Sequence, residues 1–117
     1  METQATAVCS LKSDTVTAKI CGEIDHHTVR SVRREIDEAL YTALPRKLVL
    51  DLSSVSFMDS SGLGLIVGRV GGAKEIGATV EIIGASARVC RILEMAGLYR
   101  TAGLIIKDNK NHTNEEG

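Results

Sequence analysis

The sequence contains no tryptophan and only three other aromatic residues, two tyrosines and one phenylalanine. Proteins that bind single-stranded nucleic acid stack the bases on aromatic side chains, and this chain has few to offer. Its charges nearly balance, with 14 lysines and arginines against 15 aspartates and glutamates and a formal net charge of -1. Without a strongly basic surface, the chain lacks the electrostatic attraction that holds nucleic acid. We therefore expect no direct nucleic-acid partner.

Long apolar runs are missing too, and the first residues lack the basic and apolar segments of a signal peptide. The three cysteines, Cys9, Cys21 and Cys90, are scattered, and none belongs to a Cys-x-x-Cys pair. We interpret them as free, mostly buried thiols of a protein in a reducing compartment. These absences predict a cytoplasmic protein that does not contact a membrane.

Metal ligands are not clustered along the chain. His26 and His27 are adjacent, but neighbouring side chains on a helix or strand do not converge on one ion. We therefore expect neither a metal site nor a cofactor.

The length of 117 residues, with 44% hydrophobic and 25% charged residues, suits a single soluble globular domain. We place this domain at residues 1–107. Residues 108–117 contain no apolar side chain, so we expect them to form a disordered polar tail.

Hydrophobic periodicity in the first half predicts a hairpin followed by a helix. A weak strand near residues 6–11 and an alternating strand at 15–21 flank Ser13-Asp14, a pair that suits a tight turn. Gly22 is expected to end the second strand, and a polar loop over 23–28 follows. The next segment has apolar residues at three- and four-residue spacing before Pro45 stops it: Val29, Val32, Ile36, Leu40 and Leu44.

The next strand and helix are the most apolar part of the chain. Residues 47–52 form a continuous apolar run, which is typical of a central strand buried on both faces. A helix is predicted over 63–76, with Gly77 as its C-terminal cap. Gly71-Gly72 should destabilise this helix by about 1 kcal/mol each relative to alanine.

The remaining elements complete an α/β pattern. We predict a strand at 79–83, a short helix between Ser86 and Gly97, and a last strand at 104–106. The order predicts a mixed sheet in which an N-terminal hairpin is followed by parallel strands, covered by a layer of amphipathic helices.

The corner Met58-Asp59-Ser60-Ser61-Gly62 places two hydroxyl groups beside a carboxylate where the central strand leads into a helix. Serine and aspartate are common N-caps because their oxygens accept bonds from the first-turn N–H groups. The glycines from Gly62 onward also resemble a phosphate-binding turn. However, the lysine of the Walker pattern is missing, and Val67 stands where the third glycine of the dinucleotide pattern belongs.

The serines of this corner allow two further interpretations. A hydrolase nucleophile needs Gly-x-Ser-x-Gly, but Met58 and Asp59 replace the first glycine for Ser60 and Ser61. A phosphoacceptor needs only an exposed hydroxyl, and the positive end of a helix dipole tolerates the new phosphate. Residue chemistry therefore leaves a plain cap and a phosphoacceptor open, and we expect no enzymatic activity.

Two stretches resemble one known family. Residues 50–69 are similar to the central motif of STAS-domain anti-sigma factor antagonists, and residues 22–28 to the loop between their second strand and first helix. The resemblance covers nearly the whole chain, to about Ile106. It implies a STAS-like fold and a non-enzymatic antagonist. Its unphosphorylated form would bind an ATP- or ADP-bound anti-sigma factor, itself a serine kinase, and release the sigma factor for transcription.

The resemblance also implies roles for individual residues. The kinase would phosphorylate Ser60, the first serine after the aspartate of the motif, and a dedicated serine phosphatase would reverse this. Asp59 would help to position the corner, and Gly62 would allow close backbone approach. The implied partner-binding surface consists of Glu23, Asp25, His26, His27, Asp59, Ser60, Ser61, Gly62 and Leu63.

Alternatives to this hypothesis remain at this point. A STAS scaffold subunit of a large stress-signalling assembly would share the fold, and a small nucleotide- or anion-binding protein would use the glycine corner. Without the resemblance, Asp25-His26-His27 would be interpreted as an ordinary helix cap with solvated imidazoles. The sequence does not distinguish a sporulation sigma factor from a stress-response one.

Overall fold

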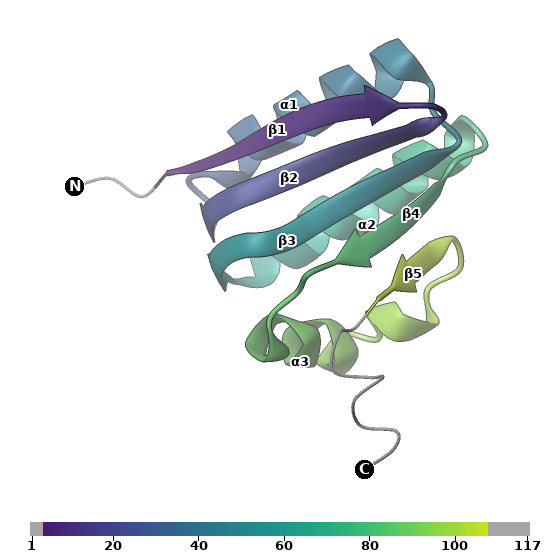
Figure 1. Ribbon diagram of the computed structural model, residues 1–117. Helices are drawn as coiled ribbons and strands as arrows, with labels where there is room; N and C mark the ends of the chain where they lie inside the picture. The colour runs from purple at the N-terminus through teal and green to yellow at the C-terminus, as the bar shows by residue number, and fades with distance from the viewer. Residues whose placement is uncertain (1–3, 108–117) are drawn as a thin grey trace.

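The structure, a computed structural model, describes residues 4–107 of the chain (Figure 1). The predicted polar tail at 108–117 lies outside the described residues. The elements, in order, are β1 (Ala5–Lys12), β2 (Thr15–Ile24), α1 (Val29–Ala43), β3 (Lys47–Met58), α2 (Ser60–Glu75), β4 (Thr79–Ile83), α3 (Ala87–Met95), the 3-10 turn η1 (Leu98–Arg100) and β5 (Leu104–Ile106).

The strands form one five-stranded sheet in the order β1-β2-β3-β4-β5. β1 and β2 are antiparallel, and Lys12 lies opposite Thr15 across the predicted turn, where Ser13 has a φ of 56°. The pairs β2–β3, β3–β4 and β4–β5 are parallel. The predicted mixed α/β sheet, with its N-terminal hairpin and later parallel strands, is confirmed.

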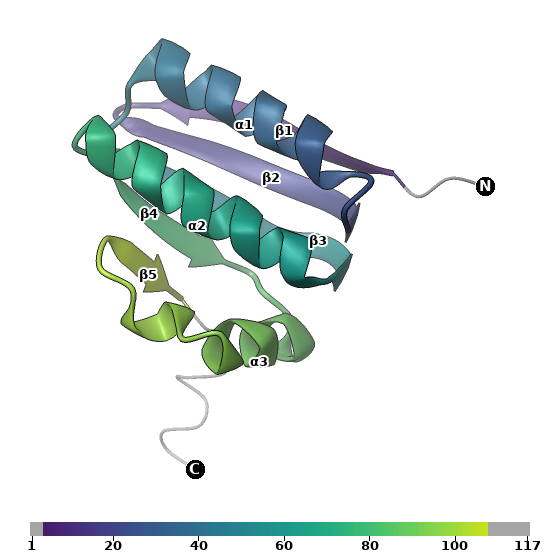
Figure 2. The same ribbon diagram turned by 180° about the vertical axis from the view of Figure 1, so that it is seen from behind.

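Helices α1 and α2 lie side by side against one face of the sheet, as Figure 2 shows from behind. In α1 the predicted stripe is buried at Val32, Ile36 and Leu40. Leu44 is an exception, because it caps the helix in a left-handed conformation with a φ of 48° and its side chain is 61% exposed. The predicted helix layer is confirmed, but its stripe ends one turn earlier than expected.

The other face of the sheet is not covered by α1 or α2 (Figure 1). β3 is nevertheless the central strand, and Leu48, Val49 and Leu50 are all buried, so the predicted burial on both faces is confirmed for this part of the strand. On the face without helices, Val49 is only 9% exposed. It stands in register with Thr17 of β2 and Glu81 of β4, so flanking side chains cover it in place of a helix.

Helix α2 continues through Gly71-Gly72 without interruption. A Cβ atom on Gly72 would overlap the hydroxyl of Tyr41 on α1, whereas a Cβ on Gly71 would meet no atom within 4 Å. Gly72 therefore permits the close approach of the two helices, and Gly71 has no such packing role. Gly77 ends the helix with a φ of 78°, in agreement with its predicted cap.

Both strands that lead toward the corner are longer than predicted. Gly22 does not end β2: it adopts a φ of 107°, the register of the β2–β3 pair shifts around it, and the strand continues to Ile24. β3 continues to Met58 and not only to Leu52, because Ile24 and Met58 still pair. The following helix then begins at Ser60, three residues before the predicted start.

The C-terminal elements follow the sequence prediction. The Ser86 side chain accepts a hydrogen bond from the N–H of Val89 at 3.1 Å and caps α3, and Gly97 follows the helix with a φ of 80°. All three cysteines lie within the described residues, where none forms a disulfide. Within residues 4–107, no helix combines the length and the apolar character needed to cross a bilayer.

Candidate functional site

The predicted site residues lie where the C-terminal ends of β2 and β3 meet. Ile24 pairs with Met58, and the N–H of Asp59 donates to the carbonyl of Ile24 at 3.2 Å. This bond ties the corner that begins α2 to the loop that leads into α1. The carboxyl ends of parallel strands are the usual place for binding sites in α/β proteins.

Asp59 caps α2. Its backbone is extended, and its Oδ1 accepts the N–H of Ser61 at 2.7 Å, while its carbonyl accepts the N–H of Gly62 at 2.9 Å. Of the two cap residues considered from the sequence, the aspartate therefore takes this role. Ser60 is the first residue of the helix and is exposed to solvent, so its hydroxyl is not needed for the cap.

The three residues after Ser60 are more enclosed than Ser60 itself. Ser61 is half-buried and faces the space between α1 and α2. Gly62 is buried, and a Cβ atom there would overlap the side chain of Met58, so only glycine fits without movement of the neighbour. Leu63 is partly buried and packs against the core. The corner thus presents one solvent-exposed serine, Ser60, beside a hydrogen-bonded cap.

The loop at residues 25–28 is held by its own side chains. Asp25 Oδ1 accepts the N–H groups of His27 at 2.8 Å and Thr28 at 3.0 Å. The Thr28 hydroxyl donates to the carbonyl of Glu23 at 2.7 Å and accepts the N–H of Asp25 at 3.0 Å. His26 and His27 remain exposed, with ring centroids 3.8 Å apart. Thr28 is buried and holds this loop, although it was not among the predicted site residues.

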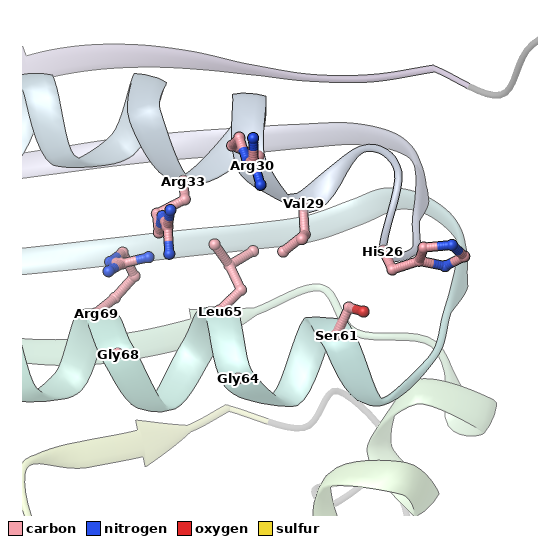
Figure 3. Close-up of a pocket in the computed structure, with 9 residues that line it drawn as sticks. All are labelled: His26, Val29, Arg30, Arg33, Ser61, Gly64, Leu65, Gly68 and Arg69. Atoms are coloured by element: carbon pink, nitrogen blue, oxygen red, sulfur yellow. The ribbon is translucent and has the colours of Figure 1, made fainter.

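A groove of about 400 Å³ runs between α1 and α2 beside the corner (Figure 3). Three of its lining residues are arginines, and none is acidic. The lining consists of His26, Val29, Arg30, Arg33, Ser61, Gly64, Leu65, Gly68 and Arg69. The groove therefore places positive charge next to the predicted phosphoacceptor corner, a feature that the sequence analysis missed.

Arg69 is the buried member of this cationic group, with only 8% of its surface exposed. Its Nε lies 2.9 Å from Oδ1 of Asp37 on α1. Burial lowers the pKa of Arg69, the charge of Asp37 opposes this, and the nearby charge of Arg33 lowers it further. A sequence signal existed: Arg69 falls at helical spacing among the buried residues Leu65 and Ala73.

The predicted partner-binding residues thus form two connected segments, the end of β2 with its loop and the start of α2. Glu23 lies in the strand and not in the loop, because β2 continues to Ile24. In the part of the chain that the structure describes, no group of three or more histidine, cysteine, aspartate or glutamate side chains is placed to hold a metal ion. The site is suited to presenting a hydroxyl and binding an anion.

Comparison with known proteins places this site in a family. The STAS domain model matches residues 10–110. The chain is 39% identical over 82 residues to the anti-sigma F factor antagonist of Paenibacillus polymyxa, covering 70% of each protein. It is 35% identical over 80 residues to the anti-sigma-B factor antagonist of Staphylococcus aureus, covering 68% of this chain and 73% of that one.

A solved structure shares the whole architecture. The unphosphorylated form of the anti-sigma factor antagonist SpoIIAA superimposes with a TM-score of 0.67 over 96% of this chain and 99% of that one, at 22% identity. The phosphorylated form of SpoIIAA, from Bacillus, gives the same TM-score. At this identity the likeness establishes the fold, and the two sequence relatives establish the family. The chain belongs to the STAS-domain family of anti-sigma factor antagonists.

Proposed function

We propose that this protein is a non-enzymatic antagonist that binds an anti-sigma factor in its unphosphorylated form and thereby releases a sigma factor for transcription. The names of its relatives, anti-sigma F and anti-sigma-B factor antagonists, support this function. The observation that carries the proposal is the exposed Ser60 at the first position of α2, beside a cap that does not need its hydroxyl.

The position of Ser60 suits a switch of binding and not of folding. A phosphate adds a charge of about -1.5 to -2, and the N-terminus of a helix is the place where a fold accepts negative charge best. The bond between Asp59 and the N–H of Ser61 does not involve the Ser60 hydroxyl, so modification of that hydroxyl removes no capping group. A partner surface packed on the corner would meet the new charge directly, so phosphorylation is expected to prevent its binding.

The proposed partner is an anti-sigma factor that is also a serine kinase. It transfers the γ-phosphoryl group of its bound ATP to Ser60 Oγ, the hydroxyl loses its proton, and ADP leaves. A serine phosphatase returns the hydroxyl. The chain itself supplies only the acceptor, so we assign it no catalytic residue and no cofactor, and we place it in the cytoplasm with its partner.

The proposed docking surface combines the start of α2 with the loop after β2. The Ile24–Asp59 bond fixes these segments relative to one another, so a partner can contact both as one rigid surface. Its members are Glu23, Asp25, His26, His27, Asp59, Ser60, Ser61, Gly62 and Leu63.

Phosphosite mapping tests the proposal. The protein is incubated with the kinase-type anti-sigma factor encoded beside its gene and with Mg-ATP, and the product is analysed by mass spectrometry. We expect one phosphate, on Ser60. Ser60→Ala should abolish the label, and Ser61→Ala, the matched control, should keep it. Absence of phosphate, or a label that survives in Ser60→Ala, would contradict the proposal.

Ser60→Asp tests whether charge at this position acts on binding. We expect weaker binding to the kinase in calorimetry, while the midpoint of thermal unfolding stays within about 3 °C, the shift expected for well under 1 kcal/mol in a domain of this size. A large loss of thermal stability would instead indicate that Ser60 has a structural role.

A further inference from the structure

The residues that line the groove between α1 and α2 carry an excess of positive charge. Arg30 and Arg33 are exposed, and within residues 4–107 neither forms an ion pair. Arg69 has one carboxylate neighbour, Asp37, which approaches it from α1. Three arginines thus line one groove, and none of the groove-lining residues is acidic (Figure 3). The nearest carboxylates that share a pocket with Arg30 and Arg33 are Asp37 and Glu38, which line the adjoining pocket along α1.

Arg69 is also incompletely bonded. Its Nη1 is enclosed by protein and has no hydrogen-bond partner among the described residues, although more than nine-tenths of the residue is buried. A buried N–H donor without an acceptor destabilises the protein, and an anion that reaches Nη1 would offset part of that cost. Arg33 lines the same groove and is exposed, and exposed side chains change rotamer readily, so one oxyanion can bind both arginines.

The shape of the groove fits a peptide side chain better than a small ion. Gly64 and Gly68 lie one turn apart on α2, and a Cβ atom on either would meet nothing within 4 Å, so the helix backbone forms an open floor. Val29 and Leu65 add apolar walls that can contact the methylene groups of a side chain. A volume of about 400 Å³ exceeds what one inorganic oxyanion fills.

We propose that this groove binds a carboxylate side chain from an acidic segment of the protein partner, held by Arg30, Arg33 and Arg69. The identity of the partner rests on the function proposed above, whereas anion binding by the groove does not. Arginine is suited to this role because its planar donors engage a carboxylate through two parallel hydrogen bonds. The groove would extend the docking surface from the serine corner along α2.

A titration of the isolated protein tests the groove without the partner. Hexaglutamate peptide is added to ¹⁵N-labelled protein, and amide shifts are followed by NMR. We expect saturable amide shifts confined to the start of α1 and to residues 64–69. Arg33→Glu should abolish these shifts. Arg91→Glu, which makes the same charge change at an exposed position on α3, should retain them. Inorganic phosphate at equal ionic strength should bind more weakly. Tighter binding of phosphate, or shifts outside the groove, would overturn the proposal.

Complex formation tests the role of the groove in docking. Arg33→Glu should weaken binding to the anti-sigma kinase by roughly tenfold or more, the effect of losing one close charge pair at an interface. Arg91→Glu should change the affinity by less than about twofold, because a charge outside an interface contributes little. If the wild-type chain binds the kinase and Arg33→Glu binds equally well, the groove proposal fails and the proposed function stands. If the wild-type chain does not bind, the proposed function fails.

A steric pair of variants on α2 separates charge from shape. Gly68→Gln fills the groove floor, and Gly71→Gln places the same side chain on the same helix outside the groove, where a Cβ also meets nothing. Both should raise thermal stability, because glutamine favours helix over glycine. Only Gly68→Gln should weaken the kinase complex. Equal affinity of the two variants would contradict an occupied groove.

Discussion

At the scale of single residues, two carboxylates hold the functional corner by accepting backbone N–H groups. The Asp59 carboxylate accepts the backbone N–H of Ser61, and the Asp25 carboxylate accepts those of His27 and Thr28. Asp59 satisfies a first-turn donor of α2 that would otherwise have no partner, whereas Asp25 holds the turn that precedes α1. The serine that we propose as the phosphoacceptor is therefore positioned by its neighbour and stays available to another protein.

Removal of the Asp59 cap should test this division of roles. Asp59→Ala is expected to lower the free energy of unfolding by about 1 kcal/mol, the usual loss for an N-cap aspartate. Ser60→Ala should cost less, because its hydroxyl does not cap the helix. Asp59→Asn keeps the acceptor and serves as the control. Urea unfolding measures all three, and a greater loss in Ser60→Ala than in Asp59→Ala would contradict the assignment.

At the scale of elements, the contact between α1 and α2 depends on one of two adjacent glycines. The missing side chain of Gly72 leaves room for the Tyr41 hydroxyl of α1, whereas a Cβ atom on Gly71 would meet no atom within 4 Å. The pattern of apolar residues does not distinguish them, because both lie within a predicted helix. The same contact sets the spacing of the groove that contains the arginines.

The two glycines should respond differently to alanine. Gly71→Ala is expected to raise the free energy of unfolding by up to about 1 kcal/mol through helix propensity alone. Gly72→Ala should gain less or lose stability, since the Tyr41 side chain must move. Thermal unfolding provides the comparison, and Tyr41→Phe, which removes the overlapping hydroxyl, should reduce the difference between the two variants. Equal gains in the wild-type background would contradict the packing role of Gly72.

At the scale of the whole molecule, an ion-pair network replaces a helix layer on the uncovered face of the sheet. The carboxylate of Glu81 on β4 forms ion pairs with two lysines. Its Oε1 lies 3.2 Å from Nζ of Lys47 on β3, and its Oε2 lies 3.1 Å from Nζ of Lys107, which follows β5. Burial by itself would raise the pKa of Glu81, but the hydrogen bonds and charges of both lysines outweigh it and lower the pKa below its ordinary 4.5. The network connects β3, β4 and the residue that follows β5.

The lowered pKa of Glu81 predicts a loss of stability in acid. A carboxyl group with a folded pKa below its unfolded pKa stabilises the fold above the unfolded value, and this contribution disappears as the pH falls through the folded value. We therefore expect Glu81→Gln to be less stable than the wild type at pH 7, with the two stabilities converging below pH 4.5. Urea unfolding across this range measures the effect, and a constant difference at all pH values would contradict it.

Much of the architecture could be predicted from local patterns in the sequence. The Ser13-Asp14 turn, the buried stripe of α1 and the Ser86 cap all depend on residues within a few positions of one another. Such features follow from backbone geometry and helical or strand periodicity, which a single chain segment already contains. The resemblance of residues 22–28 and 50–69 to one family likewise needed only the order of residues.

The tertiary structure decided what depends on neighbours far along the chain. β2 extends beyond Gly22 and β3 extends beyond Leu52 because the two strands remain paired there. The loop after β2 and the corner before α2 therefore meet through the hydrogen bond between Asp59 and Ile24. Arg69 joins Arg30 and Arg33 in one groove only because α1 and α2 pack side by side. Periodicity reports which face of an element is apolar, whereas pairing and packing determine where it ends and which charges it brings together.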